Sequence, residues 1–221
     1  MFEPGSKNRL TAHDLARFEG EGLCPRVARV VCGAGCLPRK ELYESWAVAR
    51  HVHRRFRNQG GRLIELCAGH GLLAQLLALM DASFTDVSCV DSRPPKSAAT
   101  LAQAMTARWT QLARVRYGSA ELESAEVRPG DLVVSAHACG VLTDRIIGRV
   151  IAARARVAVL PCCHEIGASP DGGLSGWLEP TLAIDVTRAA RLEAAGYAVS
   201  TRTIDPAITP KNRLLLAAPS A

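Results

Sequence analysis

The 221-residue sequence lacks long apolar runs, internal repeats and low-complexity tracts, and only 5% of its residues are aromatic. No stretch approaches eighteen uninterrupted apolar residues, because Glu65, His70 and Gln75 interrupt the most hydrophobic segment. A membrane span is therefore not expected. The first seven residues contain no apolar core of the kind that export signals carry. We expect a water-soluble, cytoplasmic protein that does not act at a membrane.

The sequence also lacks Cys-x-x-Cys pairs, although it contains eight cysteines. Without an export signal we expect reduced thiols, because disulfides persist mainly in oxidising compartments. Cys24, Cys32, Cys36 and Cys89 lie in apolar stretches or within an expected strand. We interpret these four as small buried hydrophobic residues.

The net charge of +6 is concentrated near the amino terminus. Residues 1–60 carry eleven Lys and Arg against six Asp and Glu, and this segment culminates in His51, Arg54, Arg55 and Arg57. Such a basic segment can attract a phosphate backbone. However, 23 Arg against only 4 Lys is also what a biased base composition of the coding sequence produces. RNA is therefore a possible partner through this segment, and the low aromatic content leaves little material for base stacking.

The pattern of apolar residues predicts an α/β fold. Residues 11–57 have helical character, with an amphipathic helix over 41–56, and short apolar strands then alternate with helices. The expected strands cover 62–67, 86–91, 115–117, 131–136, 156–160, 197–204 and 213–217, and the expected helices 72–80, 96–113, 142–153 and 183–195. This order predicts a Rossmann-like, doubly wound, mostly parallel seven-stranded sheet that ends in an antiparallel hairpin. We expect a basic helical N-terminal cap over 1–57 and a catalytic domain over 58–221.

A glycine-containing turn follows the first expected strand. The strand ends in Glu65, and Cys67, Gly69 and Gly71 follow directly before a helix. Glycine there permits positive φ and lets a ligand approach the backbone closely. Twenty residues after Gly71, the second strand ends in Asp91, whose carboxylate can accept hydrogen bonds from both hydroxyls of a ribose. The two features together predict a site for an adenosine-containing cofactor.

The spacing of Glu65, Cys67, Gly69 and Gly71 resembles motif I of class I S-adenosylmethionine methyltransferases. The resemblance implies S-adenosylmethionine as the cofactor, with Asp91 completing the binding residues. A carboxylate at Glu65 would repel the pyrophosphate of a dinucleotide and would suit the ammonium group of S-adenosylmethionine.

A second group of chemically reactive residues follows the fourth and fifth strands. His137 and Cys139 come after the fourth strand, and Cys162 and His164 come after the fifth. Because the carboxyl ends of parallel strands meet at one edge of a sheet, we expect these side chains to line an acceptor pocket beside the cofactor. No metal ligand is assigned among them.

The segments His-x-Cys-Gly-x-x-Thr-Asp and Cys-Cys-His resemble the methyltransferase-domain family that includes the eukaryotic tRNA 2′-O-methyltransferases acting near the acceptor stem. The resemblance covers residues 38–217 and implies an RNA substrate, with tRNA as one candidate. The sequence departs from the tRNA enzymes because it lacks their zinc-finger region. There are two alternatives. One is a small-molecule methyltransferase, and the other is a non-catalytic cofactor-binding module that assists RNA or ribosome assembly.

Three roles compete for these four residues. We favour substrate positioning and proton handling, in which neutral His137 or His164 takes a proton from the acceptor. Covalent catalysis would need a Cys139 or Cys162 thiol with a depressed pKa. A metal site would use all four residues. Nearby in the sequence, Asp185 and Arg188 lie one helical turn apart, and we expect a surface ion pair there.

Overall fold

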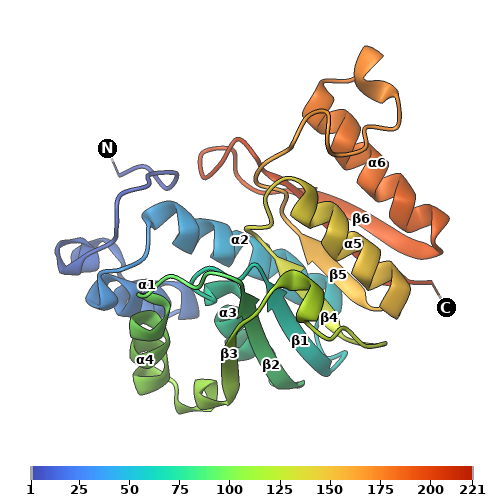
Figure 1. Cartoon of the computed structure of the whole chain (residues 1–221). Helices are drawn as coiled ribbons and strands as arrows, with labels where there is room; N and C mark the ends of the chain where they lie inside the picture. Colours follow the sequence, from blue (N-terminus) through green and yellow to red (C-terminus); the bar gives the residue numbers. More distant parts are fainter. Residues whose placement is uncertain (1, 221) are drawn as a thin grey trace.

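The computed structural model describes residues 2–220 and contains one seven-stranded sheet with the order β3-β2-β1-β4-β5-β7-β6 (Figure 1). The strands are β1 Gly61–Leu66, β2 Phe84–Asp91, β3 Val115–Ser119, β4 Leu132–Ser135, β5 Arg156–Val159, β6 Tyr197–Thr203 and β7 Arg213–Pro219. Strands β1 to β5 run parallel, whereas β7 is antiparallel to both β5 and β6. The predicted doubly wound sheet with a terminal antiparallel hairpin is confirmed.

Helices cover both faces of this sheet. They are α1 Leu23–Ala34, α2 Arg39–Phe56, α3 Leu72–Met80, α4 Ala98–Arg108, α5 Val141–Ala153 and α6 Pro180–Ala194, with short 3-10 helices η1 Ala12–Arg17, η2 Thr110–Arg114, η3 Leu122–Ser124 and η4 Leu174–Gly176. Helices α1 to α4 share one hydrophobic core with the sheet, and α5 and α6 share the other. Among residues 2–220, none of the helices has the length and apolar character needed to cross a bilayer.

Two expected helices have different bounds in the structure. The helix expected over 96–113 is divided into α4 and η2, because Trp109 has an extended backbone and its side chain is buried. Helix α6 begins at Pro180, three residues before the expected start. Proline suits the first turn of a helix, and the Glu179 side chain accepts hydrogen bonds from the backbone N–H groups of Thr181 and Leu182.

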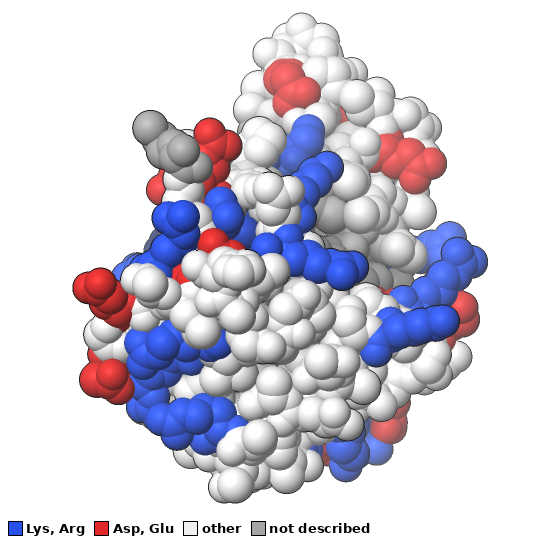
Figure 2. Space-filling model, turned by 90° about the vertical axis from the view of Figure 1, so that its left-hand side faces the viewer, with Lys and Arg blue, Asp and Glu red and all other residues white. Residues whose placement is uncertain are grey.

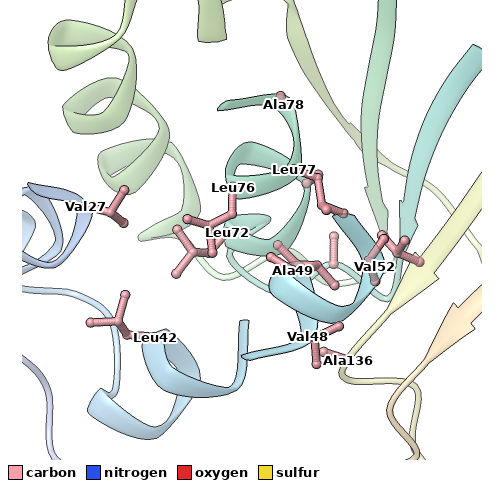
Figure 3. Close-up of a cluster of buried hydrophobic side chains, with 14 of the residues drawn as sticks. Val27, Leu42, Val48, Ala49, Val52, Leu72, Leu76, Leu77, Ala78 and Ala136 are labelled. Carbon is pink, nitrogen blue, oxygen red and sulfur yellow. The ribbon is translucent and has the colours of Figure 1, made fainter. Parts of the chain in front are cut away.

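Helix α2 packs directly on α3. The side chains of Val48, Val52 and Phe56 are fully buried, and Figure 3 shows Val48 and Val52 within the same apolar cluster as Leu72 and Leu76 of α3. Helix α3 is buried on all sides over residues 72–78, which explains why its sequence carries so few polar residues. The expected division at residues 57 and 58 remains a prediction, yet α2 contributes to the core shared with the sheet.

The contact between α2 and α3 gives a first prediction. Phe56→Ala removes a fully buried ring, so we expect a loss of about 3–5 kcal/mol in the free energy of unfolding. Leu15→Ala, a partly exposed position in η1, is the control and should change this free energy by no more than about 0.5 kcal/mol. Denaturant unfolding followed by circular dichroism measures both. A Phe56→Ala protein that keeps wild-type stability would show that α2 is a separate cap.

Candidate functional site

The loop between β1 and α3 makes a tight turn at the carboxyl end of the sheet. Gly69 has φ +53° and Gly71 has φ +72°, and Cys67 also adopts the left-handed region at φ +52°. A Cβ atom on Gly71 would lie 2.9 Å from the Cys89 Sγ and 3.0 Å from the Tyr117 Cε2. Glycine is therefore required at position 71 both by the backbone conformation and by the lack of space. We call residues 67–71 the glycine loop.

Side chains from neighbouring strands hold the glycine loop. The Asp91 carboxylate at the end of β2 accepts a hydrogen bond from the Gly69 backbone N–H at 2.9 Å, and the Tyr117 hydroxyl of β3 donates to the Gly69 carbonyl. Beneath the loop, Glu65 Oε2 accepts from the Ala74 backbone N–H at 2.8 Å. These bonds fix the loop before any ligand arrives, which reduces the ordering cost of binding.

A further contact to the loop comes from α2. The Glu41 carboxylate oxygens lie 3.1 Å from His70 Nδ1, and His70 Nε2 lies 3.0 Å from the Ser97 Oγ. Glu41 Oε1 is also 3.5 Å from the His137 Nε2. The residues preceding the Rossmann-like part therefore supply a side chain that bridges the glycine loop and the loop after β4. Glu41 was not among the site residues expected from the sequence.

A cavity of about 260 Å³ opens beside the glycine loop. Its walls include four of the predicted site residues, namely Cys67, Gly69, Asp91 and His137. Other lining residues come from the start of η3 and from α5. The cavity thus lies where β1, β2 and β4 end, the edge at which doubly wound sheets bind ligands.

A larger cavity of about 650 Å³ lies elsewhere, between α6 and the β6–β7 hairpin. Its lining is mainly apolar, and the glycine loop and Asp91 contribute nothing to it. Hydrogen-bonding groups and backbone of the glycine loop line the smaller cavity, and size alone does not make a ligand site.

Glu65 and Gly71 lie under the cavity and do not form its wall. Gly71 is buried against Cys89 and Tyr117, and Glu65 is 1% exposed. Burial, together with the nearby negative charges of Glu41 and Asp91, raises the pKa of Glu65 to about 8, although its hydrogen bond from Ala74 opposes the shift. At neutral pH Glu65 is mostly protonated. In this protonated state Glu65 supports the loop from beneath. From the sequence, we expected a charged Glu65 carboxylate that faces the ligand.

Three thiols meet at the ends of β4 and β5. The Sγ atoms of Cys139 and Cys162 are 3.1 Å apart, and both lie within 4.8 Å of the Cys163 Sγ. We call these three residues the cysteine cluster. Cys163 was not among the four residues expected to line the acceptor pocket. Its only sequence signal was its position next to Cys162.

The thiols of Cys139 and Cys162 are not activated nucleophiles in this state. Burial raises the pKa of Cys139, and burial and the neighbouring thiols raise the pKa of Cys162. Thiols with raised pKa values are protonated at neutral pH and react slowly. Covalent catalysis by Cys139 or Cys162 therefore lacks the depressed pKa that it requires.

His164 does not join the other predicted acceptor-pocket residues. Its side chain is 1% exposed, and its Nε2 lies 2.8 Å from the Asp185 Oδ1 in α6. His137 instead faces Glu41 and the cavity wall. Within residues 2–220 the four predicted residues therefore do not form one cluster, and only Cys139 and Cys162 are in contact.

The ion pair expected at the surface between Asp185 and Arg188 is buried, and the expectation of a surface position is wrong. Arg188 is 1% exposed and donates to Asp144 at 2.9 and 2.7 Å, to Asp185 at 3.2 Å and to the Gly140 carbonyl at 3.2 Å. Arg213 of β7 donates to the second Asp185 oxygen at 2.6 Å. This network joins α6 to the loops after β4 and β5, and hydrogen bonding offsets the cost of burying its charges.

The buried Glu65 carboxyl predicts a pH dependence of stability. Its folded pKa of about 8 exceeds the ordinary unfolded value of about 4.3, so the folded state holds the extra proton between these pH values. Stability should therefore fall as pH rises through this window, by up to about 1.4 kcal/mol per pH unit. The Gln side chain of the Glu65→Gln variant cannot lose a proton. The stability of this variant should therefore fall less than that of the wild type between pH 6 and pH 9. Thermal unfolding at several pH values measures the difference.

The matched control for this measurement is Glu193→Gln, at an exposed position of α6. It should follow the wild-type pH profile, because the buried Glu65 carboxyl is unchanged in this variant. Identical profiles for Glu65→Gln and the wild type would contradict the raised pKa.

Comparison with known proteins places this geometry in a family. The family model described as a methyltransferase domain matches residues 39–167. A search of curated proteins finds no significant match to the sequence.

Several solved structures share the fold. The O-methyltransferase family protein from Burkholderia thailandensis has a TM-score of 0.54 and 16% identity, covering 96% of this chain and 64% of that one. Magnesium protoporphyrin IX methyltransferase from Synechocystis PCC 6803, with bound S-adenosylhomocysteine, has a TM-score of 0.52 and 14% identity. The match covers 95% of this chain and 94% of that one. The ribosomal protein L11 methylase from Lactobacillus delbrueckii subsp. bulgaricus has a TM-score of 0.52 and 12% identity, and the match covers 79% of this chain and 77% of that one.

The family model covers more than half of the sequence and includes α2, the glycine loop and both cysteine-bearing loops. The chain therefore belongs to the methyltransferase-domain family and is an S-adenosylmethionine-dependent methyltransferase.

Proposed function

We propose that this methyltransferase acts on RNA, and that α2 guides the RNA to the cofactor cavity. The observation that carries the proposal is the course of α2, which begins beside the glycine loop at Glu41 and continues into a basic groove. The solved structures do not select an acceptor, because their names refer to acceptors as different as a ribosomal protein and a porphyrin. The argument for RNA therefore comes from this chain's own surface.

The residues around the smaller cavity fit S-adenosylmethionine. Asp91 presents a carboxylate to the cavity for the ribose hydroxyls, and Gly69 leaves the backbone open to close approach. We propose Cys67, Gly69 and Asp91 as the contacting residues, with Glu65 and Gly71 fixing the loop from beneath. When bound, S-adenosylmethionine supplies an electrophilic methyl group on a sulfonium centre.

His137 is the residue that we propose for proton handling. It lines the cavity wall, where an acceptor hydroxyl or amine would lose a proton on methylation. The Glu41 carboxylate, 3.5 Å from the His137 Nε2, orients the ring in this proposal. His164 is engaged with Asp185 and in our proposal positions the loop after β5.

A groove runs along the side of α2. Its floor and walls include Tyr43, Trp46, Arg50 and Arg54, opposite residues 203–208 of the β6–β7 connection, and they enclose about 310 Å³. Aromatic side chains can stack on bases while arginines contact the phosphates, a combination that favours single-stranded nucleic acid. The low aromatic content of the chain therefore does not exclude base stacking, because two of the few aromatic residues lie in this groove.

The groove carries excess positive charge. Arg50 and Arg54 are exposed, and neither forms an ion pair with an acidic side chain in the described part of the chain. Burial and the positive charges of Arg54, Arg202 and Arg50 lower the pKa of His51. Figure 2, which views the side of the N-terminal helices, shows several groups of Lys and Arg on this side of the molecule. Unpaired arginines of this kind suit a polyanion.

The groove and the cavity are within reach of one RNA strand. Glu41 and Arg54 lie thirteen residues apart on one helix, which corresponds to about 20 Å along its axis. A short extended strand can therefore contact the groove and place one nucleotide at the cavity. A small-molecule acceptor would favour an enclosed pocket, whereas Cys139 and Cys163, in the loops after β4 and β5, are exposed.

The cofactor assignment predicts the effect of Asp91→Asn. Loss of the charge weakens the hydrogen bonds to the ribose, each worth about 1.5–3 kcal/mol, so affinity for S-adenosylhomocysteine should fall more than about tenfold. The control is Asp86→Asn on the same strand, where the carboxylate pairs with exposed Arg116. Calorimetry with both variants measures the effect. Equal affinities for Asp91→Asn and the wild type would place the cofactor elsewhere.

The RNA assignment is tested by methyl transfer and by salt dependence. Radiolabelled methyl groups should enter total RNA and not a small-metabolite extract. The double variant Arg50→Ala/Arg54→Ala should bind RNA more weakly, and the slope of log affinity against log salt should shrink by about 1.4–1.8, the contribution of two phosphate contacts.

The control for the groove variant is Arg108→Ala/Arg128→Ala, which removes the same charge from exposed positions outside the groove. Its salt slope should stay close to the wild-type value. Label found only in small metabolites would reject RNA as the acceptor, and equal slopes for the two double variants would reject the groove. Binding of RNA without any transfer would favour the non-catalytic assembly module.

A further inference from the structure

The cysteine cluster brings three thiols from two loops to one point at the carboxyl end of the sheet. Cys139 follows β4, and Cys162 and Cys163 follow β5. Their Sγ atoms all lie within 4.8 Å of one another, and the closest pair, Cys139 and Cys162, is separated by 3.1 Å. All three are free thiols, since a disulfide needs about 2.05 Å between its sulfur atoms.

These separations suit a shared metal ion. Zinc binds thiolate sulfur at about 2.3 Å, so two sulfurs of a tetrahedral zinc site lie about 3.8 Å apart. The distances between Sγ atoms in the cluster range from 3.1 Å to no more than 4.8 Å, and the expected value of about 3.8 Å lies within this range. Small side-chain rotations would bring each sulfur to the required distance.

The two loops are anchored independently of any metal. The Gly140 backbone N–H donates to the Cys163 carbonyl at 3.2 Å, which ties the loops to each other. The buried Arg188 donates to the Gly140 carbonyl, and His164 is held by Asp185. The thiols are therefore presented by a fixed backbone, as the ligands of a metal site need to be.

We propose that Cys139, Cys162 and Cys163 bind one thiophilic metal ion, with zinc as the probe. Thiolate ligands select zinc, copper(I) and iron–sulfur centres over magnesium and calcium. Three protein ligands leave the fourth position of a tetrahedral ion to water or to an acceptor atom, which is the arrangement of catalytic zinc sites. His137, two residues before Cys139, lines the cofactor cavity, so the loop that supplies Cys139 also borders this cavity.

Zinc binding by the cysteine cluster releases protons from the thiols. Three neutral thiols and one Zn²⁺ give a tris-thiolate complex of net charge −1 and release up to three protons to the solvent. An acceptor hydroxyl or thiol bound at the open position would lose its proton more readily, because a bound zinc ion lowers the pKa of its ligands. The site would thus prepare the atom that receives the methyl group.

The experiment uses the full chain, reduced and stripped of metal with a chelator. Titration with Co²⁺ should produce a thiolate-to-cobalt charge-transfer band that saturates at one ion per chain. Added Zn²⁺ should displace the cobalt and remove the band, with proton release of up to three per zinc in weakly buffered solution. This readout is independent of methyl transfer and of RNA, so its failure leaves the proposed function untouched.

Variants identify the ligands. Cys139→Ser, Cys162→Ser and Cys163→Ser should each reduce zinc affinity by more than about 100-fold. Cys24→Ser, a half-buried thiol in α1, is the matched control, and His137→Gln separates the three-thiol site from a site that includes histidine. Both should bind one zinc ion with wild-type affinity.

Two results would overturn the proposal. One is the absence of the charge-transfer band in the reduced wild-type chain. The other is zinc binding that persists with unchanged affinity in Cys163→Ser. Circular dichroism of each variant shows whether a loss of binding reflects a lost ligand or a lost fold.

Discussion

The turn at Gly71 is the constraint on which the site depends. There is no room for a side chain there, because a Cβ atom would meet Cys89 and Tyr117 from the two neighbouring strands. The turn therefore fixes where α3 starts relative to β2 and β3. Glu65 and Asp91 accept hydrogen bonds from backbone N–H groups of the loop and α3, and the Tyr117 hydroxyl donates to the Gly69 carbonyl, so the protein itself sets the shape of the loop.

Helix α2 extends this constraint to the substrate side. Its apolar face packs on α3 through Val48 and Val52, which ties its position to the glycine loop. Its first turn supplies Glu41, which contacts His70 and approaches His137. Another side of the same helix carries Arg50 and Arg54 in the basic groove. The same helix thus takes part in the core packing, in the support of the glycine loop and in the groove proposed to bind RNA. A change in its register would disturb all three.

Much of the fold could be predicted because its signals are local. Alternating apolar strands and helices predicted the doubly wound sheet with its terminal antiparallel hairpin, and the glycine turn followed by Asp91 pointed to the edge where the smaller cavity lies. Helix bounds were less certain where one buried side chain, Trp109, overrides helical periodicity.

The contacts that could not be predicted join residues far apart in the sequence. Glu41 precedes His70 by 29 residues, and Arg188 follows Asp144 by 44, so no periodicity connects them. His164 was expected in the acceptor pocket because it follows a strand. The carboxylate of Asp185, 21 residues away, instead holds it inside. Cys163 is brought close to Cys139 by the loops after β4 and β5, a contact between residues 24 apart in the sequence.

Amide hydrogen exchange with and without S-adenosylhomocysteine tests the central claim, that the glycine loop and its supports form the cofactor site. The account predicts increased protection in peptides covering residues 67–71, 91–93 and 120–123, which adjoin the smaller cavity. Residues 182–190, beside the larger cavity under α6, should exchange as in the free protein. Protection confined to residues 182–190, with an unchanged glycine loop, would contradict the account.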